Sequence, residues 1–132
     1  MLPLVLLLAG GGAAYFLLLR PKSPKPPPPE ETYQLELTDL VVNLADQGTP
    51  HYLSASVGLV IAGVHPEEVV EEHRAQICDA VIMTVTQHTY RDLLPVEGKQ
   101  LLKDDIKAAV DEALSEQGLT VREVLFTNFL ME

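Results

Sequence analysis

A run of carboxylates marks the stretch TYRDLLPVEGKQLLKDDI, residues 89–106. Its acidic residues are Asp92, Glu97, Asp104 and Asp105. Two carboxylates can act as a general acid and a general base when a pocket separates their pKa values. Here a Pro and a Gly lie between two apolar helical patterns, so these acids fall at helix starts or on a solvated helix face. We interpret them as partners of helix dipoles and as surface charges.

Other residue types that perform chemistry are sparse and badly spaced. His73 and His88 are fifteen residues apart in one predicted helix, too far along it to chelate a metal together, and Cys78 is the only cysteine. The chain has no Gly-rich phosphate loop and no nucleophile elbow. We therefore expect no catalytic residue, no cofactor-binding residue and no metal ligand, and predict that the protein is not an enzyme.

The charge of the chain is strongly uneven. The net charge is −10, but residues 1–29 carry only three basic side chains and no acidic one. Residues 30–132 carry six Lys or Arg against nineteen Asp or Glu, a net charge of −13. Such a surface repels phosphate backbones, so we expect no nucleic-acid partner. We also expect no small-molecule substrate.

The N-terminal stretch is apolar enough to cross a membrane. Residues from Leu2 to Leu19 carry no charge, and eighteen residues in a helix span about 27 Å. A cleaved signal peptide is the alternative, but no basic segment precedes the apolar run and no small-residue cleavage site follows it. We therefore assign residues 1–20 to a transmembrane anchor.

A proline-rich segment follows the anchor. Residues 21–32 read PKSPKPPPPEET, and the prolines of this segment favour a stiff polyproline II rod of roughly 35 Å. We assign this segment to a linker that holds the next domain away from the bilayer. The basic residues Arg20, Lys22 and Lys25 all follow the anchor, so the positive-inside rule alone favours a cytoplasmic domain.

The domain at residues 33–132 begins with two predicted strands. The alternating apolar residues occupy odd positions in residues 33–37 and even positions in residues 40–44. This change predicts a bulge near Thr38 and Asp39. Residues 45–50 predict a turn. Residues 51–63 alternate cleanly, as a half-buried strand does. The two strands should form a hairpin.

Two helices and a last strand follow. Residues 65–90 predict one long helix with Pro66 in its first turn, and Arg74 falls within its apolar stripe as an overhanging, exposed side chain. Pro95 should be the first-turn proline of a second helix that Gly118 ends. The faces of the two helices are Val70, Ile77, Val81, Val85, Leu101, Leu102, Ile106, Ala109, Val110 and Ala113. The apolar segment 119–132 predicts a strand, which gives an α+β fold of order ββααβ with a small antiparallel sheet.

The order of these segments resembles a known family. The chain resembles FliL, the flagellar basal body-associated protein, in four segments and in their order. They are LTDLVVNLAD, HYLSASVGLVI, the pattern of DLL, EGK, L and I from Asp92 to Ile106, and a closing strand from Val124 to Phe129. The resemblance covers about residues 33–132. It implies a stomatin-like domain in the periplasm, carried by a single inner-membrane helix.

The resemblance also implies a function. FliL-like proteins act beside the flagellar stator, formed by MotA- and MotB-like proteins, and tend to assemble into rings that favour the engaged stator. A membrane-anchored scaffold of another envelope machine, such as a secretion system, is the alternative. Contacts with the stator or between ring subunits are expected at Arg91, Asp92, Glu97 and Lys99, unless these residues only cap helices. We further expect basic residues upstream of Met1 in the native product, since they would supply the missing cytoplasmic flank.

Overall fold

The computed structural model describes residues 29–132. The predicted anchor at residues 1–20, with Leu2 and Leu19, and most of the Pro-rich linker lie outside the described residues. Between residues 29 and 132, no helix combines the length and the apolar character that crossing a bilayer requires.

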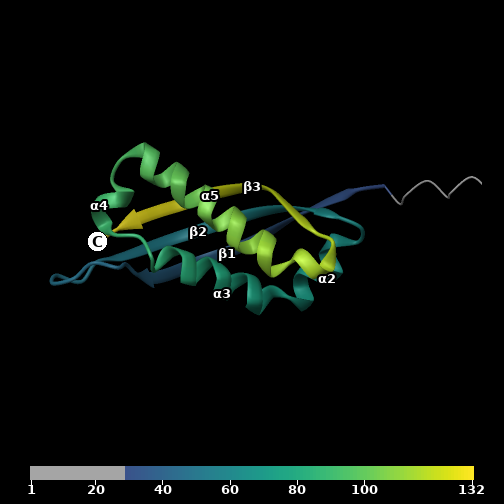
Figure 1. Ribbon diagram of the computed structural model, residues 1–132, viewed down its shortest axis with the longest axis horizontal. Coiled ribbons are helices and arrows are strands. Elements are labelled where there is room, and N and C mark those ends of the chain that lie inside the picture. Colours follow the sequence, from purple (N-terminus) through teal and green to yellow (C-terminus); the bar gives the residue numbers. More distant parts are fainter. Residues whose placement is uncertain (1–28) are drawn as a thin grey trace, which may run out of the picture.

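Three long strands form one antiparallel sheet. They are β1 (Glu31–Asn43), β2 (Tyr52–Gly63) and β3 (Thr120–Met131), in the order β1-β2-β3 (Figure 1). β2 is therefore central, and β1 and β3 are the two edges. The predicted α+β class and hairpin are confirmed, because β1 pairs with β2 directly across the loop at residues 44–51.

The predicted bulge in β1 is present. The register against β2 shifts between Leu37 and Leu40, and Asp39 takes a positive φ of 56°. The main-chain N–H of Asp39 donates to Oγ of Ser56, 3.2 Å away. The extra residue allows Leu37 and Val42, which differ in parity, to be buried on the same side of the sheet.

The helices cover one face of the sheet. They are α2 (Pro66–Glu72), α3 (Arg74–Val85), α4 (Tyr90–Leu93) and α5 (Val96–Ala113), followed by the single 3₁₀ turn η1 (Ser115–Gln117). α3 packs against α5, α2 and α3 contact β1, and α5 lies beside β3 (Figure 1). Their buried aliphatic side chains are Val70, Ile77, Val81, Val85, Leu93, Leu102, Ile106 and Val110.

The prediction of one unbroken helix over residues 65–90 was wrong. The segment breaks at His73, whose φ of −104° and ψ of 12° leave the helical region. Nδ1 of His73 lies 2.8 Å from the carbonyl oxygen of Val69, which also accepts the main-chain N–H of His73. The His73 ring therefore lies back on the last turn of α2, at the point where the helix breaks. α3 then ends at Val85, and α4 is a separate turn.

Two details of the second helix also differ from prediction. Pro95 is the residue before α5, with an extended ψ of 157°, instead of its first-turn residue. Leu101 is 59% exposed and does not widen the core face. Leu102, Ile106 and Val110 are spaced by four residues and fill the core, and Leu101 lies about 100° around the helix from that row.

The domain has two distinct ends. At one end lie the start of β1, α2 and Gly118, whose φ of 69° confirms the predicted left-handed stop, here after η1. At the other end lie the hairpin loop, α4 and the C-terminal end of β3 (Figure 1). The main-chain N–H of Ala45 donates to the main-chain carbonyl oxygen of His88, 2.8 Å away. This bond joins the hairpin loop to the segment before α4.

Candidate interaction surface

The α4–α5 corner, residues 89–101, begins with a reciprocal cap. Oγ1 of Thr89 accepts the main-chain N–H of Asp92 at 3.2 Å, and Oδ2 of Asp92 accepts the main-chain N–H of Thr89 at 3.4 Å. This capping box satisfies donors that the start of α4 leaves unpaired. The Asp92 carboxylate therefore has a structural role in shaping the corner.

Lys99 closes the other end of α4. Its Nζ donates to the carbonyl oxygens of Leu93 at 2.7 Å and Leu94 at 2.8 Å. The same ammonium lies 5.4 Å from the ring centroid of Phe129 in β3. A cation is favourable at the carbonyl end of a helix and over an aromatic face. Lys99 thus holds α4, α5 and β3 together.

Gly98 lets the two helices approach closely. It is buried, and a Cβ at this position would overlap the main-chain carbonyl of Asp92. Gly98 and Lys99 belong to the EGK segment that resembles FliL. The close approach of α4 accounts for the glycine, and the cap on α4 accounts for the lysine.

The other two predicted contact residues are on the surface. Arg91 and Glu97 are exposed, and within residues 29–132 neither forms an ion pair. Glu97 lies in the first turn of α5, where a negative charge complements the helix dipole. Of the four predicted contact residues, Arg91 and Glu97 are therefore available to a partner, and Asp92 and Lys99 act within the fold.

The corner also exposes three apolar side chains that sequence reasoning missed. Leu94 is 52% exposed, Val96 is 67% exposed and Leu101 is 59% exposed. We call these three residues the corner patch. A sequence signal existed, because Leu94 and Val96 flank Pro95 and lie outside both helical stripes. Clustered exposed apolar residues with charged neighbours are typical of binding surfaces.

Contacts behind the corner fix it to the hairpin loop. Oδ2 of Asp46 accepts the main-chain N–H of Tyr90 at 2.9 Å, and the Tyr90 ring stacks on His51 with centroids 4.4 Å apart. Nε2 of His88 lies 3.0 Å from Oδ2 of Asp105. His88 thus contacts Asp105 of α5, and together these contacts hold the corner against the rest of the domain.

The remaining candidates for chemistry are dispersed. Among the described residues, no three His, Cys, Asp or Glu side chains gather closely enough to hold a metal ion. Arg74 is exposed, as predicted, and donates to the main-chain oxygen of Glu36 at 3.0 Å and to Glu71. Asp104 and Asp105 are exposed on α5, with Asp105 paired to His88. The opening carboxylates thus do not converge on a pocket.

The corner lies within a region shared with known proteins. A model of the family described as flagellar basal body-associated protein FliL matches residues 34–131. The chain belongs to the FliL family. It is also 34% identical, over 92 residues, to the flagellar protein FliL of Aquifex aeolicus (strain VF5). That alignment covers 70% of this chain and 56% of the relative, so the chain spans little more than half the length of that curated protein.

The FliL match runs from β1 to the last residues of β3. It therefore includes β2, β3, all of β1 except its first three residues, all the described helices and the α4–α5 corner. Family membership makes the described domain part of a flagellar basal body-associated protein.

Proposed function

We propose that this protein is a non-enzymatic accessory component of the bacterial flagellar motor that associates with the MotA/MotB-like stator. An N-terminal helix anchors it in the inner membrane, and the domain stands in the periplasm as one member of a ring. The ring supports stator engagement, torque and motility. The observation that carries the proposal is the FliL match over residues 34–131, and the shape of the domain adds to it.

The corner patch is the surface we assign to the stator. It lies at the end of the domain opposite to the start of β1, where the chain enters (Figure 1). Leu94 and Val96 supply apolar contact area, and Arg91 and Glu97 supply a charged rim that sets orientation. A domain anchored at one end and offering apolar groups at the other is suited to contacting an extended partner segment.

The proposed mechanism is a shift between two stator states. A partner changes an equilibrium only as far as it binds one state better than the other. A ring of domains held off the membrane contacts the stator's periplasmic segment when that segment is extended and loses those contacts when it folds back. Binding therefore favours the extended, engaged state without any chemical step.

Deletion of the gene is the first test. We expect the deletion strain to assemble filaments in normal number and to rotate them with reduced torque, scored by tethered-cell measurements with filaments counted separately. Unchanged torque and swarming in the deletion strain would overturn the stator role. Loss of filaments altogether would instead indicate a scaffold needed for assembly.

The corner patch is then tested in the complemented strain. The variant pair Leu94→Gln/Val96→Gln removes two exposed apolar side chains without touching the core, so we expect torque to fall while the melting curve and protein abundance stay unchanged. Met83→Gln is the matched control, because Met83 is 55% exposed on α3 and is not part of the corner patch. Lys99 is a poor probe, since its replacement also releases the cap on α4. Normal torque in the corner variant would remove this surface from the proposal.

A further inference from the structure

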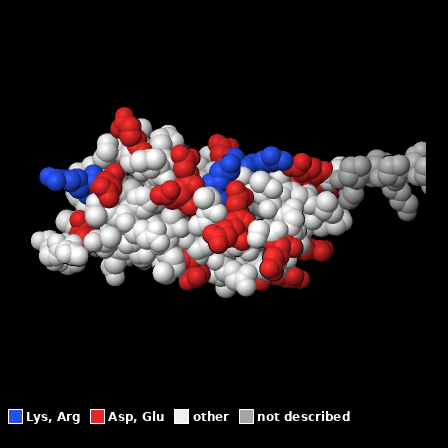
Figure 2. All heavy atoms as spheres, in the orientation of Figure 1, with Lys and Arg blue, Asp and Glu red and all other residues white. Residues whose placement is uncertain are grey.

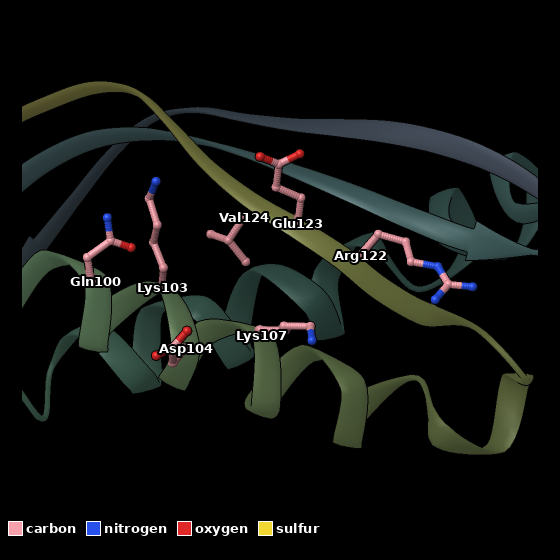
Figure 3. A pocket seen from close by; sticks show the side chains of 7 residues that line it. All are labelled: Gln100, Lys103, Asp104, Lys107, Arg122, Glu123 and Val124. Carbon is pink, nitrogen blue, oxygen red and sulfur yellow. The ribbon is translucent and has the colours of Figure 1, made fainter.

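Half of the basic side chains of an acidic domain line one hollow. Residues 30–132 contain six Lys or Arg. Three of them, Lys103, Lys107 and Arg122, border a cavity of about 330 Å³ between α5 and β3 (Figure 3). We call these three residues and their cavity the basic groove. Figure 2 shows basic atoms gathered along one band of this face among scattered acidic ones.

The two lysines of the basic groove have no acidic partner. Within residues 29–132, neither Lys103 nor Lys107 forms an ion pair, whereas Arg122 pairs with Glu30. Nζ of Lys103 lies 5.5 Å from the ring centroid of Phe126 in β3. Figure 3 shows the Lys103 side chain extending from α5 toward β3. Asp104 and Glu123 also line the cavity, so its lining carries three basic and two acidic side chains, and Lys103 and Lys107 are the two basic ones without an ion-pair partner among the described residues.

The opposite edge of the sheet carries an acidic counterpart. Glu31, Glu67 and Glu68 border a second hollow of about 160 Å³ between β1 and α2. We call these three residues the acidic face. They are exposed, and the described residues contain no ion pair that involves any of them. Glu71, close by, is instead occupied by Tyr33 and Arg74.

These two surfaces lie on different edges of one sheet. β3 borders the basic groove, β1 borders the acidic face, and β2 separates the strands. A contact between the two surfaces therefore joins different patches on two copies. Such a head-to-tail contact leaves a pair of copies with a free acidic face on one copy and a free basic groove on the other, so further copies can add, and a ring forms when the rotation closes.

We propose that the basic groove is the docking site for the acidic face of a second copy of this chain. The inference rests on the ring in the proposed function and names its interface. Charge complementarity selects this occupant: copies with a net charge of −13 in residues 30–132 repel one another unless opposite charges are brought together. The groove thus fixes the direction in which copies add.

The first experiment measures the mass of the full chain in detergent by light scattering. The groove variant is Lys103→Gln/Lys107→Gln. Its matched control is Gln87→Glu/Gln117→Glu, which changes the net charge equally at exposed positions outside both surfaces. We expect the groove variant to weaken association about tenfold or more and the control to leave it near that of the wild type. Association of the wild type should also weaken as salt rises from about 50 to about 500 mM.

The deciding experiment mixes two charge-reversed chains. Lys103→Glu/Lys107→Glu spoils the groove and leaves the acidic face intact, whereas Glu67→Lys/Glu68→Lys does the reverse. Each alone should fail to associate. An equal mixture should assemble again, because one contact is native and the other has both charges exchanged. Melting curves of each variant show that the fold is kept, and Lys107→Glu alone serves if the double variant does not fold.

Several results would overturn the interface. They are a wild type that stays monomeric at every salt concentration, an equal loss in the control variant, and a mixture that remains dissociated. None of these results bears on torque in the deletion strain, which tests the motor role separately. A groove variant that associates normally but loses torque would assign the groove to another acidic partner and reject the contact between copies.

Discussion

At the scale of single residues, Gly98 shows how packing can reverse a local preference. A glycine within a helix is usually less favourable than alanine by about 1 kcal/mol. Gly98 occupies the third position of α5, where the main chain of α4 passes so closely that a Cβ would overlap the carbonyl of Asp92. The neighbour is main chain, so it cannot move aside as a flexible side chain would.

Gly98→Ala is therefore expected to destabilise the domain by about 1–3 kcal/mol, although helix propensity alone predicts a gain. The measurement is chemical unfolding of the full chain in detergent. Gln100→Ala, at an exposed position in the same helix, is the control and should change stability little. Stabilisation by Gly98→Ala would show that α4 can separate from α5 at little cost.

Tyr33 gives a residue-scale prediction for pH. Its hydroxyl donates to Oε1 of Glu71 at 2.7 Å, and this hydrogen bond, with desolvation and the negative charge of Glu71, raises the pKa of Tyr33 above its ordinary value of 10.0. Glu71→Gln should lower the pKa of Tyr33 toward that value, as followed by the ultraviolet absorbance of tyrosinate. Glu72→Gln, at an exposed neighbour, should leave the titration unchanged, and Tyr33→Phe identifies the signal.

The sign of the linked stability follows from the direction of this shift. Because the pKa of Tyr33 is higher in the folded state, its contribution is complete below the unfolded pKa of about 10 and is lost as pH rises through the folded-state pKa. A tie between α2 and β1 should therefore loosen only in strongly alkaline solution. Loss of this contribution near neutral pH would contradict the assignment.

At the scale of elements, the strands were predictable because apolar residues alternate along them as buried and exposed side chains do. The change in parity between Leu37 and Leu40 located the bulge, and the apolar segment 119–132 located β3. The break at His73 was not predictable in this way, because a single bond from a side chain to the Val69 carbonyl leaves no periodic trace. Leu101 was misplaced since an apolar residue beside a stripe looks the same whether it is buried or exposed.

Asp111 joins two elements that sequence spacing did not connect. A carboxylate four residues after Lys107 in a helix is placed to pair with that lysine, and Asp111 occupies this position in α5. Its Oδ1 instead accepts the main-chain N–H of Val121 at 2.6 Å, next to the first residue of β3. Val121 is fully buried, so an unpaired N–H at this position would be costly.

Asp111→Ala should accordingly destabilise the domain by about 1–3 kcal/mol, because it leaves that donor without an acceptor. Asp111→Asn keeps an acceptor oxygen and should lose less. Unfolding curves of both variants, beside Glu112→Ala at an exposed position, make the comparison. Equal stability of Asp111→Ala and Glu112→Ala would show that water replaces the carboxylate at this bond.

At the scale of the whole molecule, the family and the location of the α4–α5 corner were predictable, but the nature of that surface was not. The residues that carry the resemblance lie within the matched region 34–131. Two of the four predicted contact residues, Asp92 and Lys99, bond within the fold. The sequence sign of the corner patch is weak, because Leu94 and Val96 stand beside Pro95 outside the helical stripes but their exposure depends on how α4 meets α5.

Topology is the prediction that belongs to this scale. We expect residues 30–132 to be periplasmic, against the local charge rule, because the proposed stator contact requires it. Protease added to spheroplasts should remove the domain while a cytoplasmic marker protein stays intact. Protection of the domain until the membrane is broken would place it in the cytoplasm and refute the proposed arrangement.

The length of β1 has a mechanical consequence. Thirteen residues at about 3.3 Å each separate the point where the chain enters from the α4–α5 end by about 40 Å. A rotation of the sheet about Glu31 would therefore move the far end of the domain as the end of a lever moves. A tilt of only about 10° at the pivot displaces the corner by about 7 Å, from a strand of this length. Small rotations at Glu31 would therefore be amplified into movements large enough to make or break a contact at the far end.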